Sequence, residues 1–110
     1  MNATNETRAA QAEALFREVN ERIAESVVRF EGDEGDFVCE CSDEACAHRI
    51  TVPLEDYERV REHGERFLLE PGHEDESIET TVRDAGDFRI VEKTAPTVRA
   101  IVLRLDPRAA

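Results

Sequence analysis

Apolar residues recur every three or four positions between residues 4 and 30, and no Gly or Pro interrupts this stretch. The apolar positions, with Glu and Arg among the residues between them, are Ala12, Phe16, Val19, Ile23, Val27 and Phe30. This period matches the turn of an α-helix, so the pattern predicts one long amphipathic helix. We expect its apolar stripe to cover the rest of the domain or, alternatively, to pair with a second copy as a helical hairpin or coiled coil.

Shorter patterns follow in the middle of the chain. Gly and acidic residues at 31–36 predict a turn, after which two extended segments are expected to flank a cysteine loop, at residues 37–41 and 47–52. Pro53 is expected to open a short helix near residues 54–63, with Gly64 as its C-terminal cap. Three further strands are predicted, separated by turns at 71–72 and 84–87, over residues 67–70, 78–82 and 88–93.

The C-terminal segment fits two structures. Val98, Ile101 and Val102 have helical spacing and Pro96 suits a first helical turn, whereas the β-branched residues would also suit a buried strand. We favour a helix that ends before Pro107. The predicted fold class is α+β, in which a long N-terminal helix and a C-terminal helix pack on a small antiparallel sheet with a zinc knuckle. We interpret the chain as a single domain, 1–110, made of a helix (1–30), an α+β core (36–93) and a C-terminal helix and tail (96–110).

Composition and charge exclude several classes of function. A chain of 110 residues with 40% apolar and 5% aromatic residues has enough apolar surface for one modest core. The net charge of -12, from 26 acidic and 14 basic residues, repels polyanions, so no nucleic-acid partner is expected. No apolar run is long enough to cross a bilayer, and the first residues lack the pattern of a signal peptide. We therefore expect a cytoplasmic protein without membrane association.

Three cysteines, Cys39, Cys41 and Cys46, lie within eight residues of one another along the chain. An odd number of cysteines and the strained ring of a Cys-x-Cys disulfide argue against an oxidised framework, so the cluster indicates metal binding or redox chemistry. On an extended segment Cys39 and Cys41 project to the same side, and the loop at residues 42–45 can return Cys46 to them. Because thiolate is a strong zinc ligand, we predict one Zn²⁺ per chain.

A structural zinc ion takes a fourth protein ligand, for which the candidates are His48, His63, His73 and a carboxylate such as Asp43. His73 is preferred, because the preceding turn at residues 71–72 fixes the backbone and leaves the imidazole free to face the cysteines. His48, two residues after Cys46, is the second choice. His63 is expected to interact with the C-terminal end of the short helix instead.

Acidic residues crowd around both ligand groups, so the local field favours a cation. Glu40, between two ligands, is interpreted as an exposed loop carboxylate and not as a catalytic base. Zinc hydrolase and deaminase motifs are missing, and four protein ligands leave no position for water, so we expect no enzyme activity. The predicted function is a regulatory or protein-interaction module with a protein partner, or self-association through the N-terminal helix. A zinc-thiolate redox sensor is the alternative, followed by a metal-dependent hydrolase.

An ordered set of short blocks spans nearly the whole chain, at residues 5–7, 15–23, 37–46, 57–61, 66–73, 91–93 and 106–108. Together they resemble a family of short, functionally uncharacterised proteins of high-GC, actinobacterial-type genomes. The resemblance implies that Cys39, Cys41, Cys46 and the histidine of the Pro-Gly-His block, His73, belong to a shared metal-binding signature, and that His48 does not. This chain departs from the family pattern at Pro53, where a Ser or Thr helix cap is usual, and at residues 94–96, where a Gly-containing linker is usual. These departures affect only the boundaries of the predicted helices.

Overall fold

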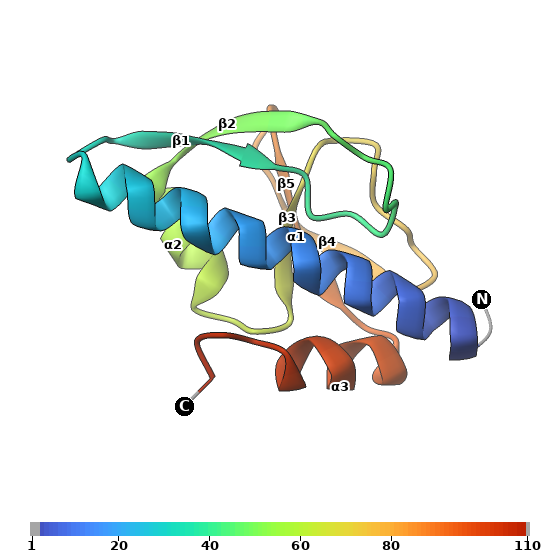
Figure 1. The fold of residues 1–110 in the computed structure, drawn as a ribbon. Coiled ribbons are helices and arrows are strands. Elements are labelled where there is room, and N and C mark those ends of the chain that lie inside the picture. The colour runs from blue at the N-terminus through green and yellow to red at the C-terminus, as the bar shows by residue number, and fades with distance from the viewer. Residues whose placement is uncertain (1–2, 110) are drawn as a thin grey trace.

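The computed structural model describes residues 3–109, which form an α+β fold built around one long helix (Figure 1). Helix α1, Ala3–Arg29, runs across the molecule, with the hairpin of β1 and β2 on one side and helix α3 on the other (Figure 1). The remaining elements are β1 (Glu34–Val38), β2 (Arg49–Pro53), α2 (Leu54–Arg61), β3 (Arg66–Leu69), β4 (Glu79–Asp84), β5 (Arg89–Lys93) and α3 (Pro96–Arg104).

The strands form two antiparallel sheets, where the sequence predicted one. Strands β1 and β2 pair with each other, and β3, β5 and β4 form a second sheet in that order. The predicted α+β class is confirmed, and the ambiguous C-terminal segment is a helix with Pro96 in its first turn. Phe37 of β1 stacks on Tyr57 of α2, with ring centroids 4.3 Å apart, so the small sheet shares the hydrophobic core of the larger one.

Gly64 has a different role from the predicted helix cap. Helix α2 ends at Arg61, and its C-cap is Glu62 in ordinary right-handed conformation. A Cβ atom on Gly64 would lie 2.6 Å from Oδ2 of Asp106 and 2.9 Å from Cδ2 of Leu103. Any larger residue here would displace the Asp106 and Leu103 side chains, because the C-terminal segment packs directly against the Gly64 backbone, a contact that local sequence does not reveal.

Helix α1 buries a different face from the predicted one. Two members of the apolar stripe stay at the surface, with Val19 39% and Phe30 78% exposed. Besides Ala12, the buried residues of α1 keep the helical period but lie on a face rotated around the axis: they are Ala9, Ala10, Glu13, Arg17, Asn20 and Ala24. The inner face of α1 is thus mainly polar at its centre, and the predicted apolar stripe covers the domain only in part, through buried Ala12 and through Ile23, which packs against the core.

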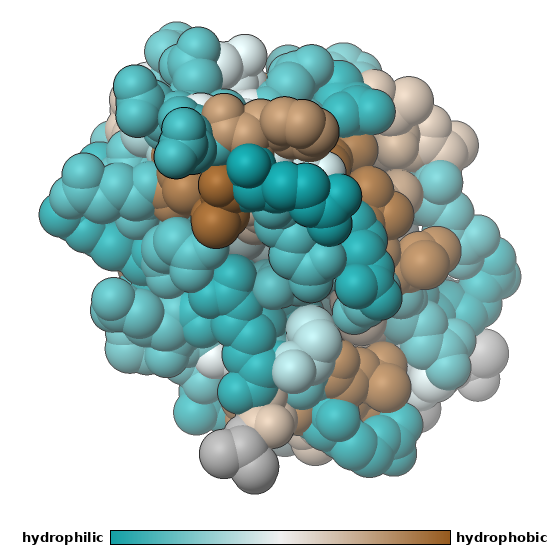
Figure 2. Space-filling view, turned by 60° about the vertical axis from the view of Figure 1, so that its left-hand side comes forward, coloured by the Kyte–Doolittle hydropathy of each residue, from teal (hydrophilic) through white to brown (hydrophobic). Residues whose placement is uncertain are grey.

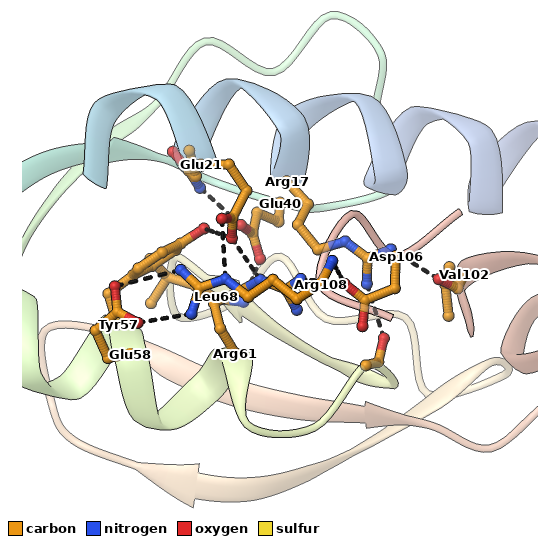
Figure 3. A network of polar contacts seen from close by, with 12 residues as sticks. Arg17, Glu21, Glu40, Tyr57, Glu58, Arg61, Leu68, Val102, Asp106 and Arg108 are labelled. Atoms are coloured by element: carbon orange, nitrogen blue, oxygen red, sulfur yellow. Dashed lines mark hydrogen bonds and ion pairs between the residues drawn. The ribbon is translucent and has the colours of Figure 1, made fainter. Parts of the chain in front are cut away.

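Arg17 lies at the centre of this inner face and contacts three other parts of the fold (Figure 3). Its two terminal nitrogens donate to the backbone carbonyls of Gly64 and Val102, each over 2.7 Å. The guanidinium also lies 4.7 Å from the centroid of the Phe67 ring, within the range of a cation–π interaction. One buried side chain therefore connects α1 to α3, to the loop after α2 and to β3.

Glu13, one helical turn earlier, takes part in a buried ionic group with Lys93 and Glu79. Nζ of Lys93 lies 2.6 Å from Oε2 of Glu13 and also contacts the carboxylate of Glu79. Burial raises the pKa of Glu13 to about 7, although the Lys93 charge opposes the shift. Two carboxylates share one ammonium group here, and the ionic group connects α1 to β4 and β5.

Glu21 forms a third connection, to α2 and the C-terminal tail (Figure 3). One carboxylate oxygen accepts hydrogen bonds from the Tyr57 hydroxyl at 2.9 Å and from Nε of Arg61 at 2.6 Å. The other oxygen accepts from Nε of Arg108 at 2.9 Å, and Arg61 also contacts Asp106. Charged side chains of α1 therefore connect it to α2, α3, the larger sheet and the C-terminal tail.

Mostly hydrophilic residues cover the end of the molecule where α1 turns into β1, with hydrophobic patches among them (Figure 2). Val28 and Phe30, at this end of α1, are 61% and 78% exposed. Within residues 3–109 no helix combines the length and the apolar character that crossing a membrane requires.

Replacing Arg17 by Ala is expected to lower the free energy of unfolding by about 3 kcal/mol or more, because two buried carbonyls lose charged donors. Arg22→Ala is the matched control, since that side chain is 70% exposed and makes only weak pairs at 3.4 and 3.5 Å with its own helix. Its expected effect is about 0.5 kcal/mol or less. Urea denaturation followed by circular dichroism measures both, and equal effects would contradict the polar anchoring of α1.

Candidate metal centre

The four predicted ligand residues meet at one place in the structure. One donor atom from each of Cys39, Cys41, Cys46 and His73 lies within 4.8 Å of all the others. Nδ1 of His73 is 3.6 Å from Sγ of Cys39 and also 3.6 Å from Sγ of Cys46. Cys39 and Cys41 are buried, whereas Cys46 is half-buried. The cluster could hold one metal ion, as the sequence predicted.

The cysteine knuckle, residues 39–46, is shaped by backbone hydrogen bonds. Strand β1, Glu34–Val38, ends before the first cysteine, so the extended segment lies three residues earlier in the chain than predicted. The Cys39 amide still donates to the His48 carbonyl over 3.0 Å, which holds the two sides of the knuckle together. At the tip, the Asp43 carbonyl accepts from the Cys46 amide over 3.0 Å, and this turn brings Cys46 back towards the other two sulfurs.

The turn at residues 71–72 places His73 beside the knuckle. Gly72 has a φ of 93°, a left-handed conformation that favours glycine, and a Cβ atom there would meet nothing within 4 Å. The His73 amide donates to the Glu70 carbonyl over 3.1 Å and closes the turn. The turn therefore fixes the backbone before His73 and leaves the imidazole facing the cysteines, as expected from the sequence.

Glu70 supports the cluster from behind through its backbone and its side chain. Its amide donates to Sγ of Cys39 over 3.2 Å, and its carboxylate lies 3.3 Å from Nε2 of His73. A proton on Nε2 that faces the carboxylate leaves the lone pair of Nδ1 directed at the sulfurs. Sequence reasoning missed Glu70, although an acidic residue three positions before a predicted histidine ligand is a usable signal.

His48, the second choice for the fourth ligand, lies next to His73 and not in its place. Its Nδ1 contacts the carboxylate of Glu70, and the two imidazole rings meet edge to face with centroids 4.8 Å apart. His48, Glu70 and His73 form a second group of possible ligand atoms. The His48 imidazole contacts the same Glu70 oxygen that faces His73, so it extends the support of His73. His63 lies 3.6 Å from Glu65 and is in neither group.

Glu40 is fully buried, so its interpretation as an exposed loop carboxylate is wrong. One carboxylate oxygen accepts from the Leu68 amide and the other from Nδ2 of Asn20, each over 2.8 Å. The Glu40 amide in turn donates to the Leu68 carbonyl over 2.8 Å, and burial raises the pKa of the carboxyl group. Glu40 thus attaches the knuckle to the edge of β3, a role that requires a partner distant in sequence.

Asn20 of α1 completes this attachment. Its side-chain amide pairs with the backbone of Val38, donating to the carbonyl and accepting from the amide, both over 2.8 Å. The side chain therefore imitates a neighbouring strand and fixes β1 where it leads into Cys39. Asn20 has no sequence signal of its own, because an isolated Asn within a helix reads as a surface residue.

The pKa values of the three neighbouring thiols favour the binding of a cation between them. A hydrogen bond from the Cys39 thiol lowers the pKa of Cys41 to about 5, and the same bond together with burial raises the pKa of Cys39. Burial also raises the pKa of Cys46. Neighbouring thiolates repel one another, so ionising all three sulfurs is unfavourable without a cation between them. A divalent ion removes that repulsion and allows all three sulfurs to act as thiolate ligands.

Comparison of the chain with protein-family models, with curated proteins and with solved structures finds no match. The resemblance to a family of short actinobacterial-type proteins stays a prediction. The assignment of the metal centre depends on the geometry of residues 39–46, 70 and 73.

Removing the Glu70 carboxylate by Glu70→Ala is expected to weaken Zn²⁺ binding about 10–100-fold, the usual cost of losing a group that orients a histidine ligand. Glu76→Ala is the control, because this exposed glutamate lies in the same connection between β3 and β4. Competition with a chromophoric chelator measures both affinities. Equal affinities for the two variants would show that the Glu70 carboxylate does not orient His73.

Proposed function

We propose that this protein is a structural zinc-binding module that holds one Zn²⁺ with Cys39, Cys41, Cys46 and His73. The supporting observation is the position of Nδ1 of His73, 3.6 Å from two sulfurs at once. A tetrahedral ion with Zn–S bonds of about 2.3 Å and Zn–N bonds of about 2.05 Å has edges between sulfur and nitrogen of about 3.6 Å. These two distances therefore match the edges of a zinc tetrahedron, and all four donor atoms lie within 4.8 Å of one another.

Two competing explanations of this spacing are weaker. An unprotonated Nδ1 has one lone pair in the plane of the ring, so a simple thiol hydrogen bond would bring one sulfur closer than the other. Equal distances to Cys39 and Cys46 fit a shared centre better. The chemistry of the donors favours zinc over magnesium or calcium, because three thiolates and one imidazole are soft ligands whereas those ions bind oxygen.

The proposed role of the ion is structural, and the protein is not an enzyme on this proposal. Four protein ligands complete a tetrahedron and leave no position for water or substrate. Both carboxylate oxygens of Glu40, which lies between two of the ligands in sequence, accept hydrogen bonds from the Leu68 amide and from Asn20, so this group does not serve as a catalytic base. The ion joins the knuckle to the turn that carries His73, and so fixes a surface loop that a protein partner can recognise. A reducing compartment such as the cytoplasm suits the three free thiols.

The exposure of Cys46 favours one second candidate, a zinc-thiolate redox sensor. Cys46 is half-buried while the other two sulfurs are buried, so an oxidant reaches it first. Two thiolates would lose two electrons to form one disulfide, a peroxide would take up these electrons and two protons to give two waters, and the ion would leave.

Protein purified without chelators is expected to contain one zinc ion per chain by mass spectrometry. Cys46→Ser and His73→Ala should lose most of the metal, whereas His63→Ala, a histidine outside the cluster, should keep it.

Chelation should lower the melting temperature by about 10 °C or more, because ligands so far apart in sequence form a site only in the folded chain. Protein without metal, or with unchanged stability after chelation, would contradict the structural role. Stoichiometric zinc release by an equivalent of peroxide would instead favour the redox sensor.

A further inference from the structure

A groove runs between the first half of α1 and the tip of the cysteine knuckle. It consists of two adjoining hollows, both bordered by Arg8 of the helix and Glu44 of the loop. The loop residues 42–45 form one wall, and the other wall follows α1 from Arg8 to Phe16. We call this feature the knuckle groove.

The floor of the knuckle groove is apolar, with small residues next to a large exposed one. Ala9 and Ala12 are buried and leave room beside the helix, because their side chains are short. Leu15 on the same side of the helix is 63% exposed. A hollow with small side chains at its base and an exposed leucine at its edge can accept a large apolar side chain.

The charges around the knuckle groove determine which kind of partner can approach. The loop wall presents Asp43 and Glu44, and the Arg8 side chain pairs with Glu44 over 3.4 Å in an exposed contact worth little energy. A zinc ion with three thiolates and a neutral imidazole carries a net charge of about -1, which adds to the acidic loop. With a net charge of -12, the chain repels a second copy of itself, and it also repels nucleic acids and anionic membranes.

We propose that the knuckle groove binds a short basic peptide segment of a partner protein. The segment inserts a large apolar side chain beside Leu15 and places Lys or Arg side chains against Asp43 and Glu44. This inference rests on the proposed function, because the loop wall lies between the ligands Cys41 and Cys46 and the ion fixes both of its ends. Binding is therefore metal-dependent, although no peptide atom touches the ion.

Peptides selected from a random phage-displayed library on the zinc-loaded protein test the proposal. Selected peptides are then measured by fluorescence anisotropy against the wild type, Leu15→Gln and Val28→Gln. Val28 is the matched control, because it is 61% exposed on the same helix but borders a different hollow, formed with α2 and Arg108. We expect net positive peptides with a large apolar residue, at least tenfold weaker binding to Leu15→Gln, and binding to Val28→Gln within twofold of the wild type.

Three results would overturn the proposal: no enriched peptide, selected peptides without net positive charge, or equal binding to Leu15→Gln and the wild type. Light scattering on the same samples can give a fourth contradicting result. If the wild type is a dimer and Leu15→Gln is a monomer, a second copy of the chain occupies the groove. Zinc content is measured in every sample. Zinc-loaded protein that fails these tests refutes the groove alone, whereas protein purified without zinc refutes the proposed function. Undiminished peptide binding after chelation overturns the metal dependence.

Discussion

The structure depends on the polar inner face of α1, which replaces the apolar stripe that usually docks an amphipathic helix. Arg17 donates to carbonyls of the loop after α2 and of α3, while Glu13 shares Lys93 with Glu79. Such buried charged bonds add little net stability over a well-packed apolar contact, but each is costly to break because an unpaired charge would remain. They therefore restrict α1 to one position on the rest of the fold.

That position determines where the candidate metal centre can form. Asn20 holds the end of β1 at Val38, and Glu40 attaches the next turn of chain to β3. Strand β3 leads to Glu70, whose amide contacts Cys39 and whose carboxylate faces His73. Two buried polar contacts thus position the cluster: Asn20 with Val38 fixes the chain before Cys39, and Glu40 with Leu68 fixes the knuckle beside the strand that leads to His73. On the proposed function, an ion held by Cys41 and Cys46 would fix both ends of the knuckle loop, which forms one wall of the proposed peptide groove.

Local patterns were sufficient to predict most of the fold and the four residues that cluster as candidate ligands. The long helix, the hairpin before α2, the turn at residues 71–72 and the C-terminal helix all follow from apolar period, Gly and Pro. The inner face of α1 could not be predicted, because Glu13, Arg17 and Asn20 read as surface residues until their partners are known. The carbonyls that accept from Arg17 lie 47 and 85 residues further along the chain. Glu40 and Gly64 were misinterpreted for the same reason: their roles come from tertiary contacts.

The convergence of three sulfurs and one imidazole is most directly tested by X-ray absorption at the zinc edge of the purified protein. We expect a first shell of three sulfur atoms at about 2.3 Å and one nitrogen at about 2.0–2.1 Å, with the outer-shell scattering of an imidazole ring. The imidazole contribution should disappear in His73→Ala and persist in His48→Ala. A shell dominated by oxygen, or one that His73→Ala leaves unchanged, would contradict the assignment of the metal centre.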